Sequence, residues 1–85
     1  MNHRTTPRFW QAYASLPDEI RRLADRNFEL LKSDPFHPSL HFKKVGKFWS
    51  ARVGLQYRAL AVAQDDGYTW VWIGDHEAYS RLLGG

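Results

Sequence analysis

Two prolines divide the chain into halves whose hydrophobic patterns require different secondary structure. Pro35 and Pro38 lie in the segment 34–38, where each removes a backbone donor and restricts the residue before it, so no helix continues through the segment. Before it, apolar residues recur near the roughly 3.6-residue period of a helix, and after it short β-branched and aromatic runs are separated by glycines or acids. The chain is therefore predicted to fold as helices followed by strands.

The first half predicts two helices. Thr6 followed by Pro7 is typical of an N-cap and a first helical position, since proline fixes φ and has no N–H to leave unpaired. Pro17 breaks this short helix. A second helix is expected over about 17–32, with Ser15 suited to cap it.

The second half predicts strands and a closing helix. The strands are expected at about 40–45, 48–53, 57–63 and 69–74, and a short helix at about 76–83. This order predicts an α+β fold, in which two N-terminal helices pack on one face of a small antiparallel sheet of about four strands, with a short C-terminal helix. The other face of the sheet is expected to stay partly open.

The length of 85 residues leaves room for a single domain spanning 1–85, and a domain of this size needs a core dense in large side chains. Four Trp, four Tyr and five Phe supply it. Trp49, Trp70 and Trp72 alternate with small or branched residues and are expected in this core rather than as stacking surfaces for nucleobases.

Several classes of protein are excluded or disfavoured by composition. The absence of cysteine excludes disulfides, thiolate chemistry and Cys-based zinc sites. The four histidines show no metal-ligand spacing, so neither a metal nor another cofactor is expected. No apolar run approaches the roughly 18 residues of a membrane span, and no apolar secretion signal follows the first residues, so a cytoplasmic protein is expected.

The net charge of +3 is distributed unevenly along the chain. Residues 1–34 hold six Lys and Arg against five Asp and Glu, residues 35–64 hold five against none, and residues 65–85 hold one against four. The middle third, which carries most of the predicted strands, is therefore uniformly basic. We expect this positive charge on the open face of the sheet, where it suits an anionic partner such as nucleic acid.

Three stretches of the second half resemble a known family. They read Phe-Trp-Ser-Ala-Arg-Val-Gly over 48–54, Tyr-Arg-Ala-Leu over 57–60 and Trp-Ile-Gly-Asp-His-Glu-Ala-Tyr over 72–79. With the two-helix opening and the segment around the prolines, they resemble the RelE/ParE superfamily of bacterial toxins over nearly the whole chain. An N-terminal strand, which this family has, would have to fit within about residues 2–5 and is expected to be short or missing.

The resemblance implies a toxin of a type II toxin-antitoxin pair, held inactive by a cognate antitoxin protein. The RelE-like branch implies an mRNA interferase, an endoribonuclease that cleaves mRNA on the ribosome by acid–base chemistry without a metal. The ParE-like branch implies instead an inhibitor of DNA gyrase that has no known catalytic centre. A solitary, non-toxic domain of the same fold is the third reading.

The resemblance also implies candidate catalytic residues. Arg58, in the Tyr-Arg-x-Leu strand, matches an arginine that contacts the reacting phosphate in RelE-like enzymes, and Arg52 matches less firmly. A three-residue loop over 54–56 would pair the two arginines on one face of the sheet, whereas a two-residue loop would put them on opposite faces. His76 and Tyr79 stand where RelE-like enzymes carry a residue for acid–base or stacking roles. The alternatives are solvated or ion-paired arginines, His76 as a helix cap and Tyr79 in the core.

The first strand and its turn supply the candidate RNA-binding residues. They are His41, Lys43, Lys44 and Lys47. They match a lysine-rich stretch that RelE-like enzymes use on RNA or the ribosome, and no acid interrupts the block. The alternative is that these lysines protect a sheet edge against aggregation.

Overall fold

The computed structural model describes residues 2–84, in which helices precede and follow a sheet. The helices are α1 (Pro7–Ala14), α2 (Asp18–Ser33), the short 3-10 helix η1 (Pro38–Leu40) and α3 (His76–Leu82). The strands are β1 (Asn2–Thr5), β2 (Lys43–Val45), β3 (Phe48–Val53), β4 (Tyr57–Gln64) and β5 (Gly67–Asp75). None of these helices combines the length and the apolar character needed to cross a bilayer.

The strands form one sheet in the order β1-β5-β4-β3-β2. Strands β2 to β5 make the predicted antiparallel meander, whereas β1 joins the edge of β5 in parallel. The predicted α+β class is confirmed, with five strands in place of about four. The N-terminal strand, which is expected to be short or missing, is present and short, with four residues at Asn2–Thr5.

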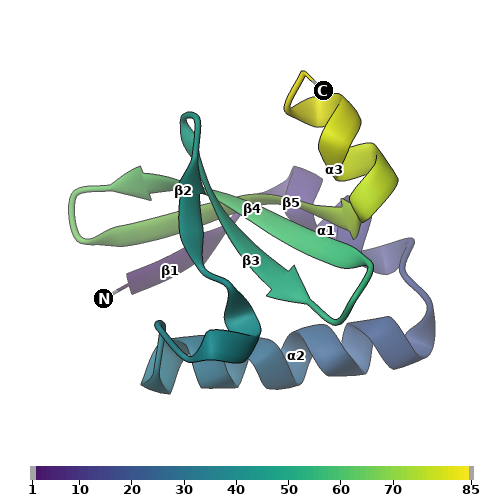
Figure 1. Cartoon of the computed structure of the whole chain (residues 1–85), viewed down its shortest axis with the longest axis horizontal. Helices are drawn as coiled ribbons and strands as arrows, with labels where there is room; N and C mark the ends of the chain where they lie inside the picture. The colour runs from purple at the N-terminus through teal and green to yellow at the C-terminus, as the bar shows by residue number, and fades with distance from the viewer. Residues whose placement is uncertain (1, 85) are drawn as a thin grey trace.

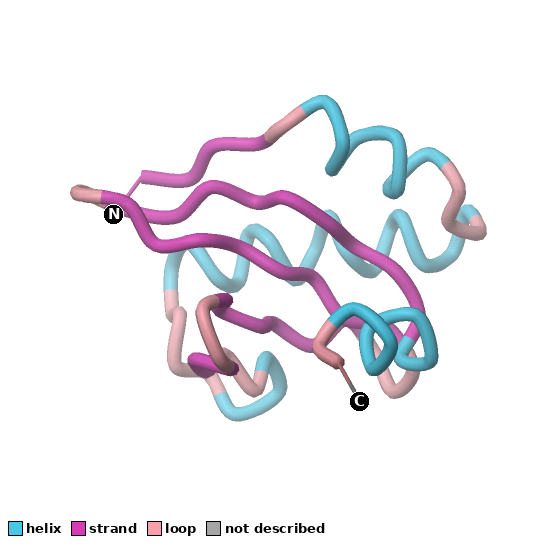
Figure 2. The backbone as a smooth tube through the Cα atoms, turned by 90° about the horizontal axis from the view of Figure 1, so that it is seen from above, coloured by secondary structure: helices cyan, strands magenta, loops and turns pink. Residues whose placement is uncertain are grey.

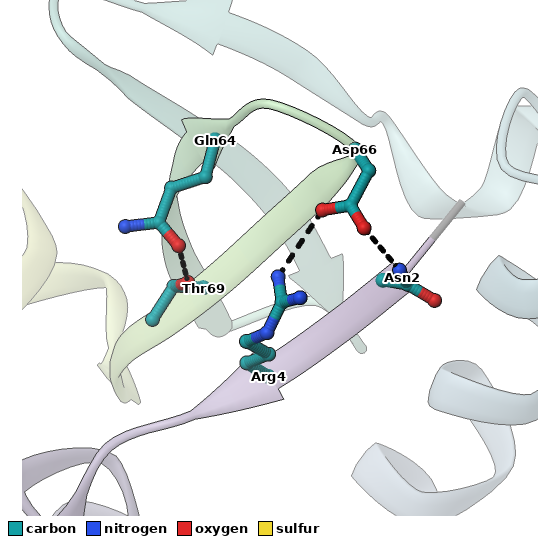
Figure 3. Close-up of polar contacts among 5 residues, drawn as sticks. All are labelled: Asn2, Arg4, Gln64, Asp66 and Thr69. Carbon is teal, nitrogen blue, oxygen red and sulfur yellow. Dashed lines mark hydrogen bonds and ion pairs between the residues drawn. The ribbon is translucent and has the colours of Figure 1, made fainter.

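Contacts with the β4–β5 turn hold β1 in place (Figure 3). The Asn2 backbone N–H donates to the Asp66 carbonyl at 2.9 Å, and the Asn2 side-chain amide and the Arg4 guanidinium both reach the Asp66 carboxylate. A Cβ on Gly67 would collide with the backbone of Asn2, so a glycine is needed for this close approach. These partners lie more than 60 residues apart in the sequence, beyond the reach of any local pattern.

The helix starts follow the expected chemistry in one case and depart from it in the other. Thr6 caps α1, since its hydroxyl accepts from the Phe9 N–H at 3.1 Å. Ser15 does not cap α2 as predicted, because it is already the C-cap residue of α1. Pro17 precedes α2 without a side-chain cap, and acidic residues in the first turn instead complement the helix dipole.

Helix α2 lies under one face of the sheet, α3 lies on the other side at one end, and α1 packs beside β5 (Figure 1). In the view from above, α2 lies behind the strands and α3 lies in front of them (Figure 2). The covered face packs into a buried cluster of Leu16, Leu31, Leu40, Phe42, Ala51, Val53, Ala59, Ala61, Trp70 and Ile73. Each large side chain buried there contributes roughly 1.5–3 kcal/mol.

A bulge in the β4–β5 pairing decides which tryptophan enters this core. Leu60 pairs with Trp72 and Ala61 with Trp70, so the register skips Val71. Because of this extra residue Trp70 and Ile73 both face the helices, and Trp72 faces the opposite side with Leu60. The prediction that Trp72 lies in the core is therefore wrong, whereas Trp70 is buried there and Trp49 packs against it.

The start of the sheet region also differs from prediction. The first strand of this region is predicted at about 40–45, but η1 occupies Pro38–Leu40 and β2 starts only at Lys43. His41 has a left-handed backbone with φ of 45°, which ends η1 and interrupts the extended chain. His41 is thus a loop residue rather than a strand residue.

Candidate functional site

Arg52 and Arg58 are direct partners across β3 and β4. The pairing of Val53 with Tyr57 leaves the loop 54–56 between the strands, which is the loop length that pairs the two arginines. Their neighbours Ala51 and Ala59 belong to the helix-covered core. Since side chains alternate along a strand, both arginines project on the opposite, open face.

Within residues 2–84, no acidic side chain pairs with either arginine. Arg52 Nε donates to the Gly54 carbonyl at 3.0 Å, and Arg58 Nη1 donates to the Tyr57 carbonyl at 3.2 Å. The ion pairs found within residues 2–84 involve four other cations, Arg4, Arg21, Lys32 and Arg81. Two half-buried positive charges thus face each other, an arrangement that a bound anion would stabilise.

Helix α3 brings Tyr79 and His76 to Arg58. The guanidinium carbon of Arg58 lies 5.8 Å from the centroid of the Tyr79 ring, and the His76 ring stacks on Tyr79 with centroids 5.7 Å apart and planes at 22°. Three of the four candidate catalytic residues therefore form one continuous series of contacts. Arg52 joins them through its strand pairing with Arg58.

The cap of α3 is Asp75, whose carboxylate accepts from the Ala78 N–H at 2.8 Å. The alternative role of His76 as this cap is therefore wrong. His76 is the first helical residue, its side chain is exposed, and its backbone N–H donates to the Gln56 carbonyl at 2.6 Å. Tyr79 is half-buried and lies outside the core cluster, so the alternative that places it in the core is wrong as well.

The acids beside His76 are engaged along α3 itself. Asp75 caps the helix, and Glu77 pairs with Arg81 at 3.2 Å, one helical turn away. Neither of these two carboxylates forms an ion pair with the Arg58 guanidinium. The His76 imidazole is exposed and stacks on Tyr79, which in turn contacts Arg58, so it is available to exchange a proton with a group bound near these residues.

The predicted RNA-binding residues do not form one surface, and one of them, His41, contacts Arg52. Lys43 lies opposite Ser50 in β3, on the face of the arginines, and His41 Nε2 lies 3.2 Å from Arg52 Nη1. Lys44 lies opposite Trp49, on the other face. Lys47, in the β2–β3 turn, lies over the Phe48 ring at 5.4 Å. All four are exposed.

Solved structures give the comparison, since no family model and no curated protein sequence matches the chain. A RelB-RelE antitoxin-toxin complex from Methanococcus jannaschii matches with a TM-score of 0.74 and 16% identity, over 93% of this chain and 96% of that one. A YoeB/ParE toxin from Agrobacterium tumefaciens matches with a TM-score of 0.68 and 15% identity, over 89% and 99%. A RelE-RelB complex from Pyrococcus horikoshii OT3 matches with a TM-score of 0.63 and 19% identity, over 87% and 92%.

The chain has the RelE/ParE toxin fold. The similarity extends over most of both chains in each pair, so it includes the helices and the sheet together. In this RelE/ParE fold the open face carries both arginines, and the end of that face carries α3. No three His, Cys, Asp or Glu side chains within residues 2–84 lie close enough together to hold a metal ion.

Sequence reasoning missed one residue of the open face of the RelE/ParE fold. Trp72 lies on this face, half-buried, and its indole covers the Cα of Gly74 so closely that a Cβ there would collide with it. Gly74 pairs directly with Arg58. The glycine in an otherwise bulky strand is the signal in the sequence, because such a glycine marks a close approach.

Proposed function

We propose that the chain is the toxin of a type II toxin-antitoxin pair and cleaves mRNA on the ribosome. The observation that carries this proposal is the contact series Arg58, Tyr79 and His76, next to a second arginine, on a face where neither arginine pairs with an acid of the described part of the chain. Arginine suits this role because its planar donors hold two phosphate oxygens and its charge is permanent. The RelE/ParE fold supports the same assignment.

The reaction needs no metal or cofactor. The 2′-oxygen forms a bond to the adjacent phosphorus while the bond from phosphorus to the 5′-oxygen breaks, which leaves a 2′,3′-cyclic phosphate and a 5′-hydroxyl. Arg58, with Arg52 across the strand, stabilises the charge that builds on the phosphate oxygens. His76 donates a proton to the departing 5′-oxygen, and water takes the proton of the 2′-hydroxyl.

Lys43 and His41 extend the positive face beyond the arginines, and Lys44 and Lys47 border it at the β2–β3 edge. In this account they contact the RNA backbone, where each cation neutralises phosphate charge and makes binding salt-dependent. A cytoplasmic location follows from a ribosomal substrate. A lysine-bordered edge also resists strand addition, so the two roles are compatible.

The proposed partner that inactivates the toxin is a cognate antitoxin. Two of the similar structures are complexes of RelE with its antitoxin RelB. An acidic or amphipathic antitoxin segment would bind the basic face or displace α3, and association would slow as salt screens the charges. If toxin and antitoxin associate at the same rate in low and in high salt, charge attraction does not guide the binding of this segment.

Expression in growing cells with separate labels for new protein and new DNA tests the activity. The ribonuclease account predicts that incorporation of labelled methionine stops before that of labelled thymidine. A ParE-like gyrase inhibitor would stop thymidine incorporation first, and a non-toxic domain of the same fold would change neither. Either of the last two outcomes would overturn the proposal.

A further inference from the structure

Trp72 is placed differently from the tryptophan that precedes it in β5. Trp70 is 4% exposed, belongs to the core cluster and donates its indole N–H to His3 at 3.0 Å. Trp72 is only half-buried, lies outside that cluster and projects on the open face because of the bulge at Val71. Its large flat ring is therefore not required to complete the core under the helices.

The indole of Trp72 extends along its own strand toward Arg58. A Cβ on Gly74 would collide with the Cζ2 atom of Trp72 and lie 2.8 Å from Cη2, so the six-membered ring lies on the backbone at Gly74. Gly74 is the direct strand partner of Arg58. The ring thus lies beside the base of the Arg58 side chain, whose guanidinium contacts Tyr79 on its other side.

In a nucleotide one sugar holds a base and a phosphate close together, so an aromatic surface next to a phosphate-binding arginine suits such a ligand. We propose that Trp72 is a stacking surface for an unstacked RNA base whose neighbouring phosphate is held by Arg58. This inference rests on the proposed ribonuclease function and adds a binding determinant to it. Aromatic side chains bind single-stranded bases in this way because every base has a π-face.

Binding of a fluorescein-labelled single-stranded oligoribonucleotide, followed by anisotropy over a series of salt concentrations, tests the proposal. Trp72→Leu removes the ring while keeping apolar cover over Leu60, and it should weaken binding about ten-fold or more without changing the salt dependence. Trp72→Phe keeps a smaller ring and should bind with intermediate affinity. Trp10→Leu, which removes a half-exposed indole from α1, should bind like the wild type.

A second arm uses the wild-type protein alone, so it does not depend on the folding of any variant. Oligoribonucleotides with one abasic position, moved along the chain, should lose a similar factor in affinity at one position and little elsewhere. Arg58→Ala separates this inference from the proposed function. If Arg58→Ala weakens binding while Trp72→Leu and every abasic substitution leave it unchanged, RNA binding stands and the stacking role is refuted. Absence of wild-type binding at low salt would overturn both.

Discussion

Arg52 and Arg58 face each other across β3 and β4 with no carboxylate paired to either within the described residues. Like charges in directly opposed positions destabilise a sheet. Each guanidinium turns to a backbone carbonyl, which satisfies a donor but leaves the charge uncompensated. The fold therefore keeps a repulsive pair that only an external anion neutralises, and such a cost is typical of a functional site.

Sulfate or phosphate should raise the melting temperature of the protein more than chloride does at the same ionic strength. An anion at ten times its dissociation constant stabilises a fold by about 1.4 kcal/mol. For a domain of this size the corresponding shift is roughly 5–10 °C. Arg58→Met should lose most of this response and, in chloride, be at least as stable as the wild type. Arg22→Met, on the exposed side of α2, should keep the full response.

Asp75→Ala should impair the candidate catalytic site indirectly, by destabilising α3. The variant loses the N-cap of a helix that has only seven residues, at a cost of about 1 kcal/mol, so α3 should fray and move Tyr79 away from Arg58. Amide hydrogen exchange in α3 should speed up and RNA cleavage should slow. Asp75→Ser restores a capping hydroxyl and should recover both. If exchange speeds up while cleavage is unchanged, the position of Tyr79 is irrelevant to the reaction.

His76→Gln should separate proton transfer from binding. It removes the proton donor but leaves the cap at Asp75, so stability and ribosome binding should be retained. Cleavage should slow by roughly 10²–10⁴, the usual contribution of general acid–base catalysis. Because His76 acts as an acid, the limb of the pH–rate profile on which the wild-type rate falls with rising pH should flatten. An unchanged profile would leave catalysis to the arginines alone.

Stability should fall below pH 6.5 because of His3. Burial among aromatic rings, and then nearby positive charges including Lys32, hold the pKa of His3 below its ordinary value of 6.5. The unfolded chain therefore binds a proton that the folded chain resists, so this contribution is complete above pH 6.5 and is lost as pH falls toward the folded pKa. Protonation also removes the acceptor of the Trp70 indole N–H.

The measurement is the denaturant midpoint of unfolding between pH 7.5 and pH 5.5. His3→Phe should be less stable at pH 7.5, by about 1–3 kcal/mol, because the buried Trp70 donor loses its partner. Its midpoint should depend less on pH than that of the wild type. His37→Gln, in the loop before η1, should retain the wild-type dependence. Equal slopes in wild type and His3→Phe would show that His3 does not carry the effect.

A second loss of stability is expected at lower pH, where Asp66, which contacts Asn2 and Arg4 of β1, becomes protonated. Arg4 first, and then Asn2, hold the pKa of the exposed Asp66 carboxyl below its ordinary value of 3.8. The stabilising contribution of a carboxylate with a lowered pKa is present above pH 3.8 and is lost as pH falls through the folded pKa. Asp66→Asn should remove this transition and increase hydrogen exchange in β1. If β1 exchanges as slowly in the variant, its backbone pairing alone is sufficient.

Local patterns in the sequence predicted most of the elements but not the two features that depend on distant contacts. The segment between the prolines, the Thr6 cap and the alternating strands each carry a signal within a few residues, and these elements are confirmed. Strand β1 has only four residues, and its partners are in the β4–β5 turn. A strand of four residues is too short for a hydrophobic periodicity to predict it.

The bulge in β5 shows why the candidate site was only partly predictable. The spacing of Arg52 and Arg58 left a three-residue and a two-residue loop open, and the structure has the three-residue loop that pairs them. The alternation rule places Trp70 and Trp72 on one face, whereas the register skips Val71 and separates them. The proximity of Tyr79 to Arg58 depends on how α3 packs on the sheet, which a pattern of residues does not specify.

Cleavage of a defined mRNA on programmed ribosomes, mapped by primer extension, tests whether the protein is a ribosome-dependent ribonuclease. The wild-type protein should cut the mRNA within the ribosome, and Arg58→Ala should cut it roughly 10²–10³ times more slowly, the usual loss when one donor to a developing oxyanion is removed. A thermal melt should show that Arg58→Ala remains folded, and Arg22→Ala should cleave at the wild-type rate. Ribosomal mRNA left intact by the wild type, or cut equally fast by a folded Arg58→Ala variant, would contradict the account.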